Sequence, residues 1–390
     1  AMALLGPGRA RGLRRAGSAE LKWAAGGGGG GRRPPAGRRG AGLENVGNTC
    51  FLNSVLQCLT YTPPLATALV QGGGGSTSCG RANCSACALR DLVQRSYATP
   101  GRTMVPASFV AGLPELPGSF RAGRQEDAHE YVRCLMERIC EDGGSGPGPQ
   151  FGGSERVNGE KKMPCTPALQ IFGGRLRSRI VCTQCGHCSD TFEPIMDLSL
   201  ECLSAGSLEE ALGSFTAEEA LDGENRYACP ACGLKVRAVK RLTLEDAPQV
   251  LALQLKRFDP CLGGKMDRVI AYPKVLDAGS FTSGGSGATY RLYAVLVHAG
   301  PSAAAGHYFC YARSPAGGWL KLDDDVVLWA SERAALSQRA YILFYERQPG
   351  AAPRPGPSRP GLSGLLRLLR PPRSRRPRAT PRGGPAAGSR

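Results

Sequence analysis

Apolar residues follow Cys50 at helical spacing. They are Phe51, Leu52, Val55, Leu56 and Leu59. The five residues before Cys50 are Asn-Val-Gly-Asn-Thr, most of which are types that favour turns and helix caps. This change of pattern predicts a helix that begins at Cys50.

The wider pattern divides the chain into a helical part and a strand-rich part. Residues 43–141 have mainly helical character, with amphipathic segments at 89–96, 108–110 and 127–139. Later strand-like runs, broken by glycine, are 169–181, 250–258, 290–297 and 341–345. Helices first and strands afterwards predict an α+β architecture.

Cys50 is a candidate nucleophile because of its predicted place at a helix N-terminus. Unpaired N–H groups and the positive end of the helix dipole favour a thiolate there, so we expect a lowered pKa. Asn45 lies in the preceding loop, where its amide can donate to a developing oxyanion. The alternative interpretation is an inert, half-buried cysteine. A catalytic role requires a base elsewhere in the chain.

His307 is the candidate base among the four histidines of the chain. It lies in Gly-His-Tyr-Phe-Cys-Tyr, residues 306–311, which predicts a strand entered through a glycine turn. A second predicted strand starts at Trp319 and ends at three acids, residues 323–325. Adjacent antiparallel strands can place a carboxylate beside His307 and its imidazole toward Cys50. The alternative is that the three acids form a solvated turn.

Several segments together resemble one known family. Residues 41–346 resemble the catalytic domain of the ubiquitin-specific proteases, papain-like cysteine isopeptidases that remove ubiquitin from proteins. The matching segments, in the family's order, are the cysteine box (42–59), Gln-Glu-Asp-Ala-His-Glu (125–130), two Cys-x-x-Cys pairs, Leu-Gln-Leu-Lys-Arg-Phe (253–258) and the histidine box (306–311). Two features resemble the branch of the family that includes nucleolar members: the sequence around Gln125, and the cluster of Cys79, Cys84 and Cys87.

The resemblance implies a fold and a set of catalytic roles. The fold has a helical thumb, a β palm and β fingers that hold ubiquitin. Cys50 would be the nucleophile, His307 the general base, and Asp323 the residue that orients the imidazole. Asp324 follows directly, and the division of labour between these two acids stays open. Asn45 matches the family's oxyanion position.

The resemblance also implies a channel for the C-terminal tail of ubiquitin. Asp127 and Glu130 match acidic positions that meet the arginines of that tail, a charge-assisted pairing. Other matching positions that line the channel are Gln125, His129, Phe258, His298 and Tyr308.

Two Cys-x-x-Cys pairs predict a structural zinc site. Their four thiolates suit a tetrahedral metal, and each pair is followed by a glycine near its turn. The predicted ligands are Cys182, Cys185, Cys229 and Cys232. The gap between the pairs is longer than in a compact zinc finger, and the resemblance places them at the ends of long strands. The alternative is a reduced, metal-free remnant. We assign no metal to Cys79, Cys84 and Cys87.

Charge is concentrated at the two ends of the sequence. The net charge of the 390 residues is +17, to which residues 1–40 contribute +8 and residues 347–390 contribute +11, leaving −2 for the rest. Both end segments are rich in glycine, proline or arginine, so we expect disordered extensions at 1–40 and 347–390 flanking a catalytic domain at 41–346. The basic extensions predict a nuclear or nucleolar address or a weak RNA contact, or else a solubilising linker.

Cysteine usage and hydropathy favour an intracellular protein, and we expect a monomer. Sixteen cysteines in 390 residues lie below the density of disulfide scaffolds, and we find no signal peptide or long apolar run, so no membrane contact is expected. The location expected is the nucleus or nucleolus, with the cytoplasm as an alternative. Three functions fit parts of the sequence: an active deubiquitinase, a catalytically weak ubiquitin-binding scaffold, and a zinc module that binds RNA. The third leaves residues 42–54 and 306–311 unexplained.

Overall fold

The computed structural model describes residues 39–71, 83–118, 120–143, 156–157, 160–161, 167–258, 264–284, 288–302 and 305–349. The predicted disorder of residues 1–40 and 347–390 therefore falls almost wholly outside the described residues. The described residues form two compact units. The first contains residues up to 178, 191–217 and 241–349, and the second contains 179–190 and 218–240.

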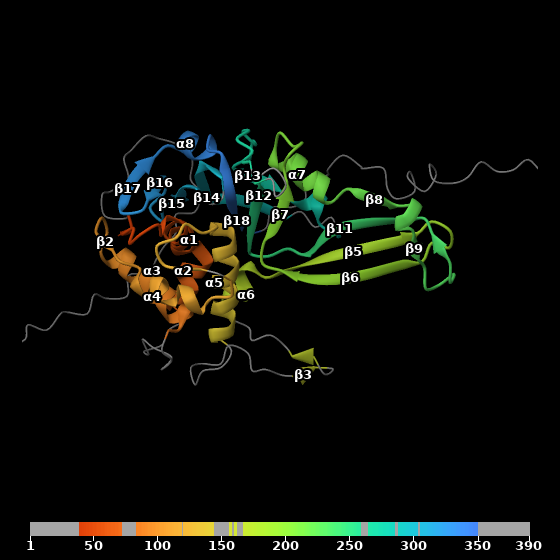
Figure 1. The fold of residues 1–390 in the computed structure, drawn as a ribbon, viewed down its shortest axis with the longest axis horizontal. Helices are drawn as coiled ribbons and strands as arrows, with labels where there is room; N and C mark the ends of the chain where they lie inside the picture. The colour runs from red at the N-terminus through yellow and green to blue at the C-terminus, as the bar shows by residue number, and fades with distance from the viewer. Residues whose placement is uncertain are drawn as a thin grey trace, which may run out of the picture. The chain divides into compact units, whose positions relative to one another are not determined.

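Five helices come first in the first unit, as predicted (Figure 1). They are α1 (Cys50–Thr60), α2 (Pro63–Gln71), α3 (Ser85–Ala98), α4 (Ala107–Gly112) and α5 (Ala128–Gly143), with the short η1 (Leu113–Glu115) after α4. Every residue of α1 is buried, because the helix lies against β14, β15 and β16 as well as against α3 and α5. Several of its polar groups find partners inside the fold: Gln57 Nε2, for example, donates to the carbonyl of Ala41 at 2.9 Å.

An eight-stranded sheet forms the other layer of the first unit. Its order is β17-β16-β15-β14-β18-β12-β7, with β13 paired to β14, and its strands are antiparallel except for the parallel pair β12 and β7. The strands are β7 (Leu198–Glu201), β12 (Val250–Lys256), β13 (Val275–Asp277), β14 (Thr289–Ser302), β15 (Ala305–Arg313), β16 (Trp319–Asp323), β17 (Val326–Ala330) and β18 (Ala340–Arg347). Helices followed by strands confirm the α+β prediction.

Strand β14 carries apolar side chains on both faces of this sheet. Ala294 and Leu296 join the core cluster that contains α1, whereas Leu292, Val295 and Val297 join the cluster on the opposite face. Strict alternation would place Leu292 with Ala294. A register shift between these two residues in the pairing with β18 changes the phase, so each half of the strand still buries both faces.

A second sheet has the order β6-β5-β11-β8. Its strands are β5 (Gly174–Cys182), β6 (Cys188–Ile195), β8 (Glu218–Leu221) and β11 (Ala238–Asp246). The second unit contains β8, parts of β5, β6 and β11, η2 (Gly223–Asn225) and the hairpin of β9 (Tyr227–Ala228) and β10 (Lys235–Val236). Short pairs elsewhere are β1 (Gly42–Leu43) with β2 (Thr103–Met104), and β3 (Arg156–Val157) with β4 (Glu160–Lys161); η3 is Gly279–Phe281.

Three helices correct the predicted pattern of elements. The run 169–181 was expected to be one strand, but Pro167–Phe172 forms α6, whose Ala168, Ile171 and Phe172 are buried at helical spacing, and the strand begins at Gly174. Helix α7 (Leu208–Phe215) was not predicted, although its N-terminus carries a capping pattern. Ser207 Oγ accepts from the N–H of Glu210, and the Glu210 carboxylate accepts from the N–H of Gly206. Helix α8 is Glu332–Leu336. No helix in the described part of the chain is both long and apolar enough to cross a bilayer.

Candidate active site

Cys50 is the first residue of α1, as predicted, and its side chain is buried. Burial raises the pKa of the Cys50 thiol, and the nearby carboxylate of Asp324 raises it further. A hydrogen bond from the backbone of Tyr308 on β15 lowers the pKa, and hydrogen bonds from the backbone of Phe51 and Cys50, which are the helix-end effect expected from the sequence, lower it less. The predicted net lowering is nevertheless wrong, because desolvation is the larger effect. The thiol therefore needs a base to become a nucleophile.

His307 is hydrogen-bonded to Asp323 across two neighbouring strands. β15 and β16 pair antiparallel, and Nε2 of His307 lies 2.6 Å from Oδ1 of Asp323. Burial alone would raise the pKa of Asp323, but hydrogen bonds from His307 and Lys321 hold it below its ordinary value, so the carboxylate accepts and Nε2–H donates. This tautomer leaves Nδ1 of His307 unprotonated. The backbone of the next residue, Tyr308, meets the Cys50 thiol, so the imidazole and the thiol lie at the same end of β15.

Asp324 has different partners from Asp323. Val326 pairs with Asp323, so Asp324 and Asp325 form the connection between β16 and β17, and Asp324 has a left-handed φ of 49°. Its Oδ2 accepts from Asn45 Nδ2 at 2.8 Å and its Oδ1 accepts from Asn53 Nδ2 at 2.8 Å. The turn thus divides the roles that the sequence left open: Asp323 faces the imidazole and Asp324 faces two amides.

The side chain of Asn45 is held in one orientation. Its Oδ1 accepts from the backbone N–H groups of Thr49 at 3.1 Å and Gly47 at 3.2 Å, while its Nδ2 donates to Asp324. Asp324 thus fixes the amide that was predicted to be an oxyanion donor. Asn53, one turn after Cys50, is a contact that the sequence reading did not single out, although it lies inside the cysteine box.

Asp127 accepts four hydrogen bonds from within the chain. Its Oδ1 caps α5 by accepting from the N–H groups of His129 at 2.8 Å and Glu130 at 2.9 Å. Its Oδ2 accepts from the hydroxyl of Tyr341 at 2.6 Å and of Tyr308 at 3.4 Å. Tyr341 was expected only as part of a strand. The carboxylate therefore ties the start of α5 to β15 and β18.

His298 is an unusual buried histidine beside this carboxylate. It is 2% exposed, and neither ring nitrogen has a hydrogen-bond partner among the described residues. Its ring lies 4.5 Å from that of Tyr308 and 5.4 Å from that of Phe258. Burial, followed by the charge of Lys265, lowers the pKa of His298 to about 4, so the ring is neutral at physiological pH. Three predicted channel residues are thus brought together.

The remaining predicted channel residues have separate surroundings. The Gln125 amide accepts from Gly306 N–H at 2.9 Å and donates to Gly306 C=O at 2.6 Å, which fixes the residue before His307. His129 is turned to Asp197, with Nε2 2.7 Å from Oδ2. Glu130 is exposed. Of these three, only Glu130 presents a charged group to solvent.

The four predicted zinc ligands form one cluster in the second unit. The Sγ atoms of Cys182, Cys185, Cys229 and Cys232 all lie within 4.8 Å of one another, and no disulfide joins cysteines of the described residues. Gly186 and Gly233, with φ of 76° and 68°, close the two turns by donating to the carbonyls of Cys182 and Cys229. Four convergent thiols on two such turns suit a tetrahedral metal.

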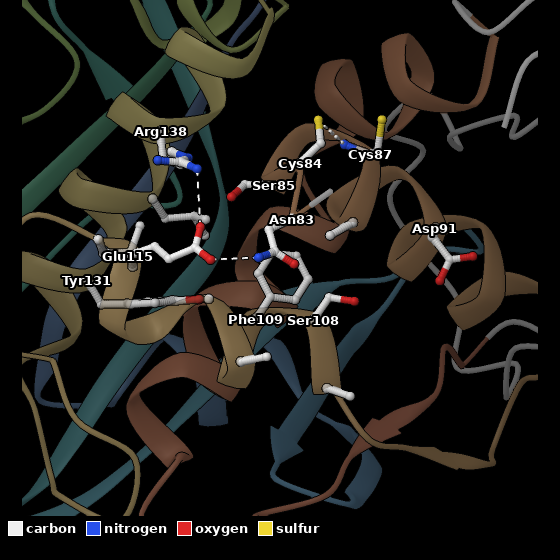
Figure 2. A pocket seen from close by; sticks show the side chains of 16 residues that line it. Asn83, Cys84, Ser85, Cys87, Asp91, Ser108, Phe109, Glu115, Tyr131 and Arg138 are labelled. Atoms are coloured by element: carbon white, nitrogen blue, oxygen red, sulfur yellow. Dashed lines mark hydrogen bonds and ion pairs between the residues drawn. The ribbon is translucent and has the colours of Figure 1, made fainter. Parts of the chain in front are cut away.

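Cys84 and Cys87 lie elsewhere, at the start of α3 beside a cavity of about 570 Å³ (Figure 2). Cys84 caps the helix, since its Sγ accepts from the N–H of Cys87 at 3.4 Å. The cavity is lined by α3, α4, η1 and α5, and Glu115 on its wall accepts from Asn83 and Arg138. Cys79 lies outside the described residues.

Comparisons with known proteins identify the relatives of this chain. A family model described as ubiquitin carboxyl-terminal hydrolase matches residues 41–345. Ubiquitin carboxyl-terminal hydrolase 23 of Arabidopsis thaliana is 44% identical over 79% of this chain and 35% of its own length, and ubiquitin carboxyl-terminal hydrolase 42 of Homo sapiens is 40% identical over 80% and 23%. The chain thus spans about a third or less of these relatives. The solved SAGA Ubp8/Sgf11/Sus1/Sgf73 DUB module bound to ubiquitin aldehyde contains a chain with a TM-score of 0.69 and 28% identity, over 82% of this chain and 72% of that one.

Proposed function

The chain belongs to the ubiquitin carboxyl-terminal hydrolase family and has its papain-like α+β fold with thumb, palm and fingers, and from this we propose that residues 41–346 form a thiol-dependent deubiquitinase. The bond cleaved is the isopeptide or peptide bond after the C-terminal glycine of ubiquitin. One observation carries the proposal: a histidine hydrogen-bonded to Asp323 stands at the end of the strand whose backbone contacts the thiol of Cys50.

The reaction begins with transfer of the Cys50 proton to Nδ1 of His307. The raised pKa of Cys50 makes this transfer necessary, and Asp323 stabilises the imidazolium that forms. The thiolate attacks the carbonyl carbon of the terminal glycine, and the amide of Asn45, oriented by Asp324, donates to the oxyanion. His307 then protonates the departing lysine amine, which leaves an acyl-thioester. His307 finally deprotonates the water that releases ubiquitin.

The substrate tail is assigned to the surface around β15 and the start of α5. Glu130 is the exposed carboxylate there and pairs with an arginine of the tail. Asp127 acts mainly through the tyrosines that it holds, since its acceptor positions are already used. Phe258, His298 and Tyr308 supply the apolar wall. Two of the solved relatives are complexes with ubiquitin aldehyde and with monoubiquitin, which supports ubiquitin as the ligand.

A zinc ion held by the four clustered cysteines is proposed as a structural element. The thiolates of Cys182, Cys185, Cys229 and Cys232 would hold the ion, and four such ligands would leave no position for a substrate or water. When bound, the metal supplies local folding free energy to a unit with a small apolar cluster of its own. It takes no part in the chemistry.

The basic segments 1–40 and 347–390 are proposed to direct the protein to the nucleus or nucleolus, with weak contact to RNA as a secondary effect. The support is compositional, since residues 347–390 contain eleven arginines and no acid. Microscopy of a tagged chain with and without residues 347–390 tests this. An unchanged distribution would contradict the role of the second segment.

Reaction with ubiquitin that carries a C-terminal electrophile tests the enzymatic proposal. We expect a covalent adduct on Cys50, located by mass spectrometry of the peptide that contains it, and none with Cys50→Ala. Turnover of ubiquitin fused to a fluorogenic amine should follow the same pattern. A folded wild-type protein that binds ubiquitin but forms no adduct would favour the alternative, a catalytically weak ubiquitin-binding scaffold. Parallel probes made from ubiquitin-like modifiers measure the selectivity.

A further inference from the structure

The carboxylate of Asp323 has a second partner besides His307. Nζ of Lys321 lies 2.8 Å from Oδ2 of Asp323, while Nε2 of His307 lies 2.6 Å from Oδ1. Lys321 and Asp323 are two residues apart on β16, so their side chains share one face of the sheet. The two oxygens of the Asp323 carboxylate therefore contact different groups: Oδ1 contacts the imidazole of His307 and Oδ2 contacts the ammonium of Lys321.

Lys321 is itself held in place by the histidine strand. Its Nζ lies 4.6 Å from the ring centroid of Phe309, a cation–π contact. Phe309 stacks on His307 with centroids 6.3 Å apart and 24° between the ring planes. His307, Asp323, Lys321 and Phe309 thus form a ring of contacts on one face of β15 and β16, in which each side chain contacts two of the others. The lysine is not a loose surface charge, since its side chain is 34% exposed.

The shared carboxylate holds His307 in one orientation. Fixing Oδ2 on Lys321 removes one rotational freedom of Asp323, so Oδ1 stays aimed at Nε2. The imidazole is therefore turned correctly to receive the Cys50 proton.

We propose that Lys321 is a positioning residue of the catalytic histidine, acting through the carboxylate that it shares with His307. The inference rests on the proposed function, because it assigns a part in that same chemistry. The other charged or titratable groups around His307 and Asp323 are Cys50 on α1, His298 on β14, Cys310 and Tyr311 on β15 and Asp324 in the following turn. They stay unchanged in the variants below.

Three variants separate charge from structure. Lys321→Met keeps the apolar stem and removes the ammonium, whereas Lys321→Arg keeps the charge. Lys256→Met is the matched control, because Lys256 forms a 2.7 Å pair with Glu201 at the opposite edge of the same sheet. Turnover of ubiquitin fused to a fluorogenic amine is measured from pH 5.5 to 9, with thermal unfolding of each variant as the check on folding.

We expect Lys321→Met to lower kcat about threefold or more across the pH range while KM stays within twofold, because an Asp323 carboxylate that is free to rotate holds His307 less well. Lys321→Arg should restore the wild-type profile, and Lys256→Met should not alter it. A Lys321→Met profile that superimposes on that of the wild type, with kcat within twofold, would overturn the proposal and leave the deubiquitinase intact.

A measurement without turnover separates the two proposals. The Nε2–H proton of His307, observed by NMR in ¹⁵N-histidine-labelled protein and assigned with His307→Gln, reports the hydrogen bond to Asp323. We expect it to exchange with water faster in Lys321→Met than in the wild type or in Lys256→Met. This result can be obtained even if the wild type proves to be an inactive scaffold. Equal exchange rates in all three proteins would contradict the positioning role.

Discussion

Removal of the Asp324 carboxylate should uncouple the reactivity of Cys50 from catalysis. Asp324→Gly suits the test because glycine accepts the left-handed φ of 49° without a steric penalty, so the substitution removes the carboxylate alone. Two charge-assisted hydrogen bonds are lost, to Asn45 and to the buried Asn53. Asn53 keeps weaker contacts with the carbonyls of Leu43 and Glu44, so we expect the free energy of unfolding to fall by about 2 kcal/mol.

The effects on chemistry should have opposite signs. Burial is the main reason that the pKa of Cys50 is raised, and the Asp324 carboxylate adds to it. Without that charge the thiolate is easier to form, so alkylation by iodoacetamide near neutral pH should become about two- to fivefold faster. Turnover should fall by roughly 10- to 100-fold, because the Asn45 amide loses the partner that aims it at the oxyanion. Loss of structure would also accelerate alkylation by exposing Cys50, so both rates are compared under conditions in which urea unfolding shows each variant to be fully folded.

The assay compares Asp324→Gly with Asp325→Asn, which removes a negative charge one residue further along the same turn. Urea unfolding gives the stability, iodoacetamide kinetics give the thiol reactivity, and a ubiquitin-based fluorogenic substrate gives turnover. Asp325→Asn should stay within twofold of the wild type in both rates. Slower alkylation in Asp324→Gly would refute the effect of the Asp324 charge on the Cys50 thiol. Turnover within threefold of the wild type would refute the role of Asp324 in orienting the Asn45 amide.

Four further outcomes are expected. Asn45→Ala should lower turnover by about 10²–10³, measured with the same substrate, and a loss below threefold would move the oxyanion role to backbone N–H groups. Asp323→Ala should be severe and Asp323→Asn mild, because asparagine can still accept from the imidazole; wild-type turnover in Asp323→Ala would contradict the triad. Metal analysis should find about one zinc per chain, and Cys229→Ser should lower the melting temperature while Cys50 alkylation stays unchanged; fully stable metal-free protein would refute the zinc site. The pKa of His298 is lowered to about 4, so the unfolded chain takes up a proton near pH 6.5 but the folded chain only near pH 4. The free energy of unfolding should therefore fall as the pH falls from 6.5 to 4. Urea unfolding at pH 7 and pH 5 measures this fall, which should be smaller in His298→Gln.

Local patterns predicted much of what surrounds the thiol and the imidazole. The change from turn residues to an apolar period predicted the start of α1 at Cys50, and aromatic strand patterns predicted the antiparallel pair that brings His307 to Asp323. Each feature depends on a single segment or on two consecutive strands, which is why a single sequence was enough to predict it. Each Cys-x-x-Cys turn is local in the same way, whereas the convergence of the two turns was expected from the family resemblance.

Features that depend on distant packing were not predicted. The helix-end argument for a lowered pKa of Cys50 was correct about the local dipole, but the degree of burial is set by β14, β15 and β16, which are remote in sequence. The turn at Asp324 was hidden because three consecutive aspartates do not reveal where the strand ends. Tyr341 and Lys321 were missed since their importance comes from cross-strand neighbours, Asp127 and Phe309.

The complete burial of α1 limits the places at which an effector could change the catalytic rate. Amide groups in a helix covered on every side exchange with deuterium only when the surrounding layers separate, so the α1 amides should exchange near the rate of global unfolding. Cys50 is thus carried by a helix that is covered on all sides. An effector that tunes the rate can act more easily through the turn at Asp324 or through the Gln125 contact that fixes Gly306, since two hydrogen bonds hold each of these.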